Sequence, residues 1–411
     1  MRSSALLLLA FVGPLALAGD WARFRGPNGT GVSADKGVPA HWTDKDVVFK
    51  AALPGVGHSS PIVVGDRVVL LSATNAERLV LCYDAATGKR LWSHSVPGAA
   101  AKKHAKSSWA SSTPASDGER VYCVFWDGES VALHAYDLSG KALWKQDLGP
   151  FVSQHGPGFS PVVVDGKVIV NNDQDGVAAL LAFDAATGKK AWEVERRPFR
   201  ACYSTPIIAE TTNSGKMLLV TSTAAITGYD VATGKELWNF TWSFNRMALR
   251  TVASSVVTDG TVIACSGDGS GERKMIGVKL DGQGDVTKTN LLWAKDKNRA
   301  TPYVPTVVAQ GKYVYGVLDE GQAFCFEAAT GKEMWRGRRL AANVSASPLL
   351  IDGKVYVFDE RGEVFVFAAE PSELKVLART SVGEPLIASP AVANGRLYLR
   401  GERHLICVGK K

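Results

Sequence analysis

The sequence predicts an all-β protein, an eight-bladed β-propeller of four-stranded antiparallel blades whose last blade is closed by a strand from near the N-terminus. Three observations predict it: a turn motif ending in tryptophan recurs along the chain, a proline-marked strand start recurs between its copies, and the final repeat lacks one strand. The composition agrees, because the 411 residues include 41 glycines and 18 prolines to supply turns. With 46% hydrophobic and 21% charged residues, the chain is neither intrinsically disordered nor a multi-span membrane protein.

The first repeated motif is D-A-x-T-G-K-x-x-W, which stands at Asp84–Trp92 as DAATGKRLW and recurs with variations. Its Asp or Thr can bond the turn backbone, and its Gly accepts a positive φ. Because a tryptophan buries a large apolar area, we expect each indole to pack between neighbouring blades. The tryptophans predicted to have this structural role are Trp92, Trp144, Trp192, Trp238, Trp293 and Trp335.

The second motif is a serine-rich start followed by proline and a β-rich run. Seven copies have the proline, and an eighth has Val256 in its place. The spacing of about 47 residues suits one propeller blade per repeat. A seven-bladed ring is the alternative if the Val256 repeat is an insertion. The seven prolines are Pro61, Pro114, Pro161, Pro206, Pro305, Pro348 and Pro390.

The last repeat is incomplete, because strands are expected only at residues 391–392, 397–399 and 405–408 after Pro390. The segment Asp46–Leu53 (DVVFKAAL) is a predicted strand without partners nearby. Pairing it with the last repeat would complete the blade and remove an exposed sheet edge. We therefore expect residues 46–411 to form one closed ring, preceded by an N-terminal extension over residues 19–45.

Residues 1–18 are expected to be a secretory signal peptide. Arg2 precedes a small and apolar run, and Ala16-Leu17-Ala18 forms an A-x-A cleavage site. An uncleaved signal anchor is the alternative. No later stretch reaches the ~18 apolar residues that a spanning helix needs. We therefore expect a periplasmic or secreted protein without a transmembrane anchor.

These repeats resemble the pyrroloquinoline-quinone-like (PQQ-like) propeller repeat over about residues 46–411. That family includes quinoprotein alcohol dehydrogenases and the BamB-type outer-membrane assembly propeller, so the resemblance implies eight blades tied together by the tryptophan motif. The segment Trp21–Ser33 (WARFRGPNGTGVS) resembles the opening of a subgroup of exported propellers of unassigned activity.

The resemblance implies which residues a dehydrogenase function would require here: two adjacent cysteines, a Glu/Asn/Asp set for Ca²⁺ and an Asp base, as in the quinoprotein dehydrogenases. The six cysteines of this chain are never adjacent, and Cys82, Cys325 and Cys407 share one third-strand position. The histidines lack metal-ligand spacing, and hydrolase and nucleotide motifs are missing. We expect no catalytic residue, no metal site and no cofactor, with PQQ and Ca²⁺ as the alternative.

One segment, Asn171–Gly176, begins like an EF-hand loop with Asp173 and Asp175 at ligand positions. Ala182 stands where the loop needs Glu, and a strand follows instead of a helix. A β-turn is the preferred interpretation, and a surface Ca²⁺ site is the alternative.

A ligand site is expected where the last strand of each blade leads into the first strand of the next, because these segments surround one mouth of a propeller channel. In these segments Lys and Arg outnumber Asp and Glu, and the surplus is larger than the formal net charge of the whole chain, +7. Such a basic face would attract anions, and Arg can hold carboxylate or phosphate with two bonds. A scattered, solvated face is the alternative. The candidate ligand-binding residues are His58, Trp109, His155, Arg200, Tyr203, Arg250 and Tyr303.

Two functions follow. The first is an exported, non-catalytic binding or scaffold propeller, expected to be a monomer, that presents its basic face to an anionic small molecule or polymer or to an envelope or extracellular protein. Nucleic acid is an unsuitable partner for an exported chain without a nucleic-acid motif. The alternative is a periplasmic PQQ-dependent alcohol or sugar dehydrogenase, with Trp109 stacked on the quinone and Arg200 or Arg250 at its acidic groups.

Overall fold

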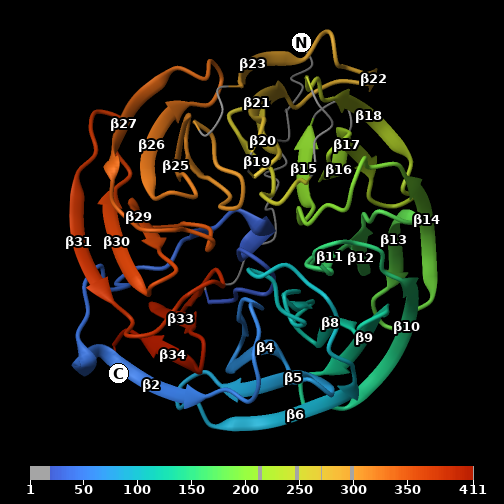
Figure 1. The fold of residues 1–411 in the computed structure, drawn as a ribbon, viewed down its shortest axis with the longest axis vertical. Coiled ribbons are helices and arrows are strands. Elements are labelled where there is room, and N and C mark those ends of the chain that lie inside the picture. Colours follow the sequence, from blue (N-terminus) through green and yellow to red (C-terminus); the bar gives the residue numbers. More distant parts are fainter. Residues whose placement is uncertain (1–18, 212–214, 246–249, 270, 297–299, 411) are drawn as a thin grey trace, which may run out of the picture.

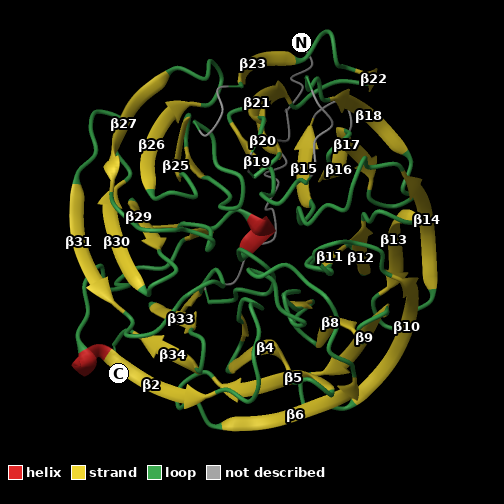
Figure 2. Ribbon diagram, in the orientation of Figure 1, coloured by secondary structure: helices red, strands yellow, loops and turns green. Residues whose placement is uncertain are grey.

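The computed structural model describes residues 19–211, 215–245, 250–269, 271–296 and 300–410, so the expected signal peptide lies outside the described residues. The strands form eight sheets around a central axis (Figure 1). Within the described residues the helices are two 3₁₀ turns, η1 (Pro27–Gly29) and η2 (Asp44–Asp46) (Figure 2). The eight-bladed prediction is confirmed, and the seven-bladed alternative is wrong because the strand at Val256 begins a complete blade.

The first four blades follow the order of the chain. Blade 1 contains β3 (Ile62–Val64), β4 (Arg67–Ala73), β5 (Glu77–Asp84) and β6 (Arg90–Pro97). Blade 2 contains β7 (Ala115–Ser116), β8 (Arg120–Trp126), β9 (Ser130–Asp137) and β10 (Ala142–Pro150). Blade 3 contains β11 (Val162–Val164), β12 (Lys167–Asn172), β13 (Ala178–Asp184) and β14 (Lys190–Arg196). Blade 4 contains β15 (Ile207–Thr211), β16 (Gly215–Thr221), β17 (Ala225–Asp230) and β18 (Glu236–Thr241).

The other four blades include two departures from simple chain order. Blade 5 contains β19 (Val256–Thr258), β20 (Thr261–Gly267), β21 (Arg273–Lys279) and β23 (Leu291–Lys295). Blade 6 contains β24 (Val308–Gln310), β25 (Tyr313–Val317), β26 (Gln322–Glu327) and β27 (Glu333–Arg339). Blade 7 contains β28 (Leu349–Ile351), β29 (Lys354–Phe358), β30 (Glu363–Ala368) and β31 (Val376–Ser381). Blade 8 contains β32 (Ala391–Ala393), β33 (Arg396–Arg400), β34 (His404–Val408) and β2 (Val47–Ala52). Two short strands add parallel edges, β1 (Val32–Ser33) on β28 and β22 (Gly284–Asp285) on β18.

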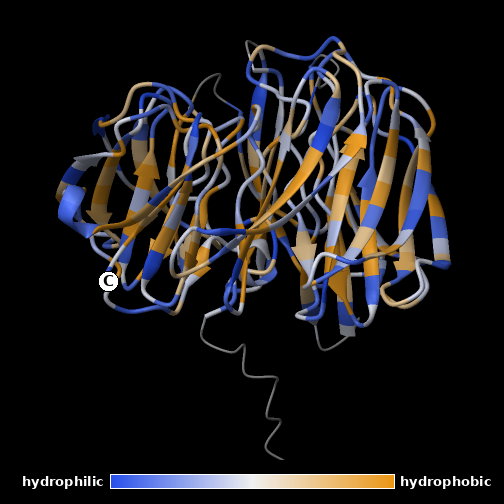
Figure 3. Cartoon of the chain, turned by 90° about the horizontal axis from the view of Figure 1, so that it is seen from below, coloured by the Kyte–Doolittle hydropathy of each residue, from blue (hydrophilic) through white to orange (hydrophobic). Residues whose placement is uncertain are grey.

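Seen from the side, the strands run between two faces of the ring, with hydrophobic stretches within the strands and many hydrophilic loops at the faces (Figure 3). The first strand of each blade runs from one face of the ring to the other, and the following strands alternate in direction because the blades are antiparallel. Turns between first and second strands and between third and fourth strands therefore share one face. The inter-blade segments and the turns between second and third strands share the other face, which we call the mouth face.

The ring is closed as predicted, because β2 pairs antiparallel with β34 in blade 8. Phe49 of β2 stands opposite Cys407, in the register position that Trp92 holds opposite Cys82. The Phe49 ring lies against Gly88 of blade 1, where a Cβ atom would come within 2.3 Å of Phe49 Cδ2. A phenylalanine therefore covers the blade 1 turn that a tryptophan would cover elsewhere in the ring.

The predicted tryptophans join neighbouring blades in five cases, where the indole Nε1 donates to a carbonyl in the turn of the following blade. These bonds run from Trp92 to Leu138, Trp144 to Ala185, Trp192 to Val231, Trp293 to Ala328 and Trp335 to Glu370. Trp238 differs, since its Nε1 donates to Met217 Sδ within its own blade. It is fully buried in a core cluster that also contains Leu280 and Val286 of blade 5.

The N-terminal extension closes one end of the channel. Its helix η1 lies at the centre of the ring (Figure 1), and Trp21 forms a β-bridge with Val63 of blade 1. The buried Arg25 guanidinium donates to the carbonyls of Thr306, Val307 and Pro348. This segment, which we call the plug, is thus tied to several blades at once.

The plug enters from the face opposite the mouth. The Gly65 N–H, in the first turn of blade 1, donates to Asp20 Oδ1 at 2.9 Å. The Gly395 N–H, in the first turn of blade 8, donates to Asp35 Oδ2 at 3.0 Å. In the part of the chain that the structure describes, no helix has the length and apolar character to cross a membrane.

Candidate functional site

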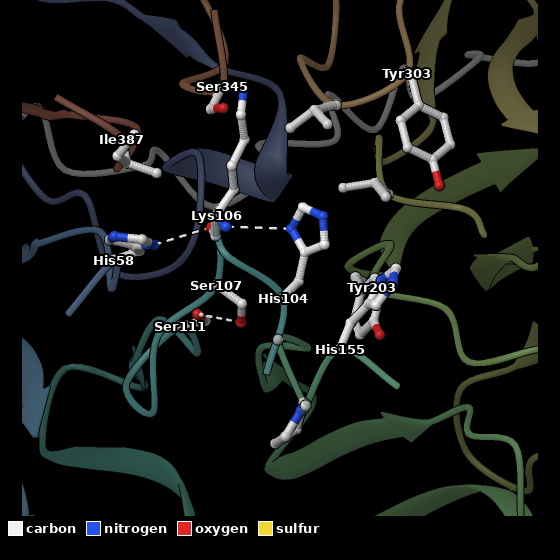
Figure 4. Close-up of a pocket in the computed structure, with 15 residues that line it drawn as sticks. His58, His104, Lys106, Ser107, Ser111, His155, Tyr203, Tyr303, Ser345 and Ile387 are labelled. Atoms are coloured by element: carbon white, nitrogen blue, oxygen red, sulfur yellow. Dashed lines mark hydrogen bonds between the residues drawn. The ribbon is translucent and has the colours of Figure 1, made fainter. Parts of the chain in front are cut away.

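Two adjoining cavities lie at the mouth face, and we call them together the mouth cavity. The first has a volume of about 270 Å³ and is lined mainly by loops that lead into first strands (Figure 4). The second has a volume of about 560 Å³. Both are lined by His104, Lys106, His155, Tyr303 and Val304, so they form one continuous region.

Six of the seven residues predicted from the sequence line this cavity. His58 and Tyr203 line the first part, Arg200 and Arg250 line the second, and His155 and Tyr303 line both. They come from the segments that lead into blades 1, 3, 4, 5 and 6, so only the closed ring brings them together. Their shared position just before a first strand was the signal that identified most of them.

Trp109 does not line the two parts of the mouth cavity. Its indole Nε1 donates to the Ala101 carbonyl at 2.9 Å. The cationic groups of Arg78 and Lys103 lie 5.5 and 5.6 Å from the centre of its ring. The ring is therefore engaged by cation–π and packing contacts between blades.

The mouth carries mixed charge, which corrects the prediction of a basic face. Arg200 forms two hydrogen bonds with Asp175, each of 3.1 Å, and Arg273 Nη1 lies 3.1 Å from Asp319. Lys106 Nζ lies 2.6 Å from Glu360. These carboxylates follow second strands, whose turns share the mouth face with the inter-blade segments. The sequence count covered only the inter-blade segments and so omitted the acids that neutralise them.

Two arginines included in that sequence count, Arg246 and Arg299, lie outside the described residues. A third, Arg196, is buried away from the mouth cavity and forms a bidentate ion pair with Asp173 at 2.7 and 3.0 Å. Its Nη1 also donates to the Tyr229 hydroxyl at 2.6 Å. Bidentate pairing of this kind fixes both side chains and makes Arg196 a structural residue.

The EF-hand-like segment holds arginines in this structure. Asp173 accepts from Arg196, and Asp175 accepts from Arg200 and from the Ala201 N–H at 2.7 Å. Burial alone would raise the pKa of Asp175, but these hydrogen bonds and the Arg250 charge hold it below its usual value. Both carboxylates are thus committed to cations of the protein itself.

Two histidines of the mouth, His58 and His155, have a pKa lowered toward the neutral form. Burial, with a contribution from the Arg400 charge, lowers the pKa of His58 to about 4. Burial and the Arg250 charge lower the pKa of His155. His58 Nδ1 lies 3.1 Å from the Lys106 carbonyl, so this nitrogen carries the proton and Nε2 is an acceptor. The rings of His104 and His155 lie with their centres 4.8 Å apart.

The mouth combines hydrogen-bond donors with aromatic walls. Its arginines and Lys106 supply donors beside the aromatic walls of Tyr203 and Tyr303, which is suitable for a planar or extended anion. Among the described residues there is no group of three or more His, Cys, Asp or Glu side chains that could hold a metal ion. The six cysteines are buried and free, and none of them lines the mouth cavity.

The sequence approach missed several residues of this site. His104 shares a wall with His155, Ser345 and Ile387 line the first part, and Arg273 lines the second. Arg273 begins a third strand, so a search limited to inter-blade segments could not find it. A signal was present in Ile387, because it stands shortly before Pro390 in the same position relative to a first strand as the predicted residues.

Comparison with known proteins agrees with this architecture. The model of the family described as outer membrane protein assembly factor BamB matches residues 27–135, 76–337 and 283–375, which together cover most of the chain. The chain belongs to this family. The BamB protein of Burkholderia pseudomallei is 23% identical over 348 residues, which are 83% of this chain and 81% of that protein.

The chain is also similar to alcohol dehydrogenases. Quinohemoprotein alcohol dehydrogenase ADH IIB of Pseudomonas putida is 37% identical over 119 residues, which are 28% of this chain and 17% of that enzyme. The BamB-family chain thus spans less than a fifth of the length of that relative. The solved quinohemoprotein alcohol dehydrogenase of Comamonas testosteroni matches with a TM-score of 0.66 at 15% identity, over 96% of this chain and 81% of that one, a likeness that shows the fold.

Proposed function

We propose that this protein is an exported, non-catalytic binding propeller whose mouth cavity takes an anionic ligand, in particular an acidic segment of an envelope or extracellular partner protein. The observation that carries the proposal is the meeting of six predicted residues at the mouth, while the plug occupies the other end of the channel. Membership of the family of an outer-membrane assembly factor supports a binding role at the cell envelope.

The charges of the mouth support an acidic partner that is extended rather than compact. Arg200, Arg250 and Lys106 line the cavity, yet each has a carboxylate of the protein within 3.8 Å. An incoming carboxylate would therefore exchange with, or add to, an existing ion pair. Such contacts are weak one at a time and gain strength only when several act along an extended segment.

The experiment is a titration of the full chain with a fluorescein-labelled oligoglutamate peptide, followed by fluorescence anisotropy. We expect saturable binding that weakens as salt is added, because screening reduces the attraction between exposed charges. Arg200→Gln should weaken it severalfold, whereas the matched variant Arg197→Gln, at a strongly exposed side chain paired with Glu195, should leave it unchanged. Absence of saturable binding, or equal effects of the two variants, would contradict the proposal.

The second candidate is a PQQ-dependent alcohol or sugar dehydrogenase, favoured by the alcohol dehydrogenases among the relatives. The cationic and aromatic groups of the mouth, Arg200, Arg250 and Tyr303 among them, would hold the acidic quinone, which supplies the redox chemistry when bound. The described residues do not fit the calcium ion. Calorimetric titration with PQQ, with and without Ca²⁺, combined with dye reduction in the presence of alcohols, tests this candidate. The absence of both binding heat and turnover would exclude this candidate.

A further inference from the structure

A third cavity, distinct from the mouth cavity, lies between blade 8 and blade 1, and we call it the junction cavity. Its volume is about 190 Å³. It is lined by Val56, Gly57 and His58 from the segment before blade 1 and by Pro385, Ile387, Ala388, Arg400, Gly401 and Glu402 of blade 8 and the segment before it. His58 and Ile387 also line the mouth cavity, so the two spaces are neighbours.

The notable group of this cavity is Arg400, at the end of β33. Its residue exposure is 1%, although a guanidinium normally keeps its charged head in water. Nη1 donates to the Leu71 carbonyl, and Nη2 lies 3.5 Å from Ser72 Oγ. Nε is buried and has no hydrogen-bond partner among the described residues. A buried donor left in this state costs free energy unless a ligand or water satisfies it.

Arg400 also forms no ion pair among the described residues. The nearest buried acid along the chain, Glu384, is already engaged by the Arg403 N–H at 2.8 Å, His404 Nδ1 at 2.9 Å and Lys50 Nζ at 3.4 Å. Burial lowers the pKa of Arg400 to about 9, which reflects a cation removed from water without compensation. The buried arginine Arg196, by contrast, has the full bidentate partner that Arg400 lacks.

The surroundings of Arg400 define what could compensate it. One guanidinium balances one negative charge, and its planar edge matches a carboxylate. The walls contributed by Val56, Pro385, Ile387 and Ala388 are apolar and suit a short aliphatic group. Glu402 also lines the cavity, but it is an exposed residue, so water screens part of its charge and it compensates Arg400 only weakly while still repelling a bound anion.

We propose that the junction cavity binds a small aliphatic monocarboxylate, whose carboxylate accepts hydrogen bonds from Arg400 while its alkyl group contacts the apolar walls. Gly57 lets the segment before blade 1 pack against the Arg400 guanidinium, because a Cβ atom there would lie 2.5 Å from Arg400 Nη2. The proposal does not depend on the proposed function, since a small acid can occupy this cavity whether or not an acidic peptide binds the mouth.

The test is a calorimetric titration of the full chain with propionate, with propionamide as its neutral counterpart and inorganic phosphate as a different anion. We expect propionate to bind saturably and propionamide not to bind, because only the charged ligand forms an ion pair with the buried cation. Saturable phosphate binding without propionate binding would overturn the carboxylate assignment. The absence of propionate binding to the unmodified protein would overturn the proposal without any need for a variant.

Variants locate the site. Arg400→Met should weaken propionate binding by at least about tenfold, as expected for the loss of a charge-assisted hydrogen bond. The matched variant Arg403→Met, at an exposed neighbouring residue outside the cavity lining, should bind as the unmodified protein does. Glu402→Gln removes a negative charge from the lining of the junction cavity and should tighten binding, and it tests the site even if the Arg400 variant does not fold. Equal affinity in the Arg400 and Arg403 variants, or weaker binding by Glu402→Gln, would refute the assignment.

Discussion

Ring closure by β2 offers the sharpest prediction, because the Phe49 ring of β2 packs the last blade against the turn of the first. Phe49 is 9% exposed, lies against Gly88, and has its ring centre 6.4 Å from that of Tyr398. The Tyr398 hydroxyl donates at 3.1 Å to the Ala85 carbonyl, the turn position that accepts an indole N–H in other blades. Phe49 therefore supplies the ring packing of a tryptophan, while Tyr398 bonds the turn as Tyr122 bonds the Ala185 carbonyl in the next blade.

The variant Phe49→Ala should lower the free energy of unfolding by about 3–5 kcal/mol, the usual cost of removing a buried phenylalanine ring. The main-chain pairing of β2 with β34 would remain possible, so we expect opening at this seam before the rest of the ring unfolds. Urea unfolding measures the loss, and hydrogen exchange should show faster exchange in β2 and β34 than in β12 and β13.

The matched control is Phe199→Ala, because that ring is 48% exposed and its truncation should change stability by less than about 0.5 kcal/mol. A loss below about 1 kcal/mol in the Phe49 variant, with unchanged exchange in β2 and β34, would refute the view that this ring closes the propeller.

Three further predictions concern the blades themselves. Gly188→Ala should destabilise more than Gly166→Ala in urea unfolding: both glycines have positive φ, but only at Gly188 would a Cβ meet an indole, at 2.6 Å, so similar losses would contradict this packing. Asp173→Ala should cost about 3–5 kcal/mol of unfolding free energy because it leaves Arg196 buried without its partner, and a loss of under 1 kcal/mol in thermal and urea melts would disprove that dependence. Burial lowers the pKa of His134 from 6.5 to about 4, so stability is complete above pH 6.5 and should fall by up to roughly 3 kcal/mol as the pH drops toward 4; urea melts of His134→Asn should lack this decline, and an identical pH profile would exclude the histidine as its source.

The fold was predictable because its determinants are local and repeated. The D-A-x-T-G-K turn fixes where third strands end, and Val256 keeps the repeat phase although it lacks the proline. The closing strand was predictable from an unpaired strand at one end and a missing strand at the other. The role of Phe49 was not, because it replaces tryptophan with a different residue type whose equivalence only the register reveals.

The site was predictable in position but not in charge. Residues such as Tyr203 and Tyr303 share a place relative to a first strand, so the periodicity alone brings them to the mouth. The acids Asp175 and Asp319 lie far along the chain from some of their partners, and their pairing depends on which turns share a face. Arg400 was invisible for a similar reason, because burial and a missing counter-ion are properties of packing that no motif records.

The plug also fixes the direction in which the ring would face when tethered. Gly19 lies beside Asn394, in a first turn of blade 8, on the side away from the mouth. Any lipid, domain or linker joined ahead of this glycine would attach to the face opposite the mouth, and the mouth would face away from the attachment point. Immobilisation by the N-terminus would then keep the mouth accessible, and a bulky N-terminal fusion would likewise leave ligand access undisturbed.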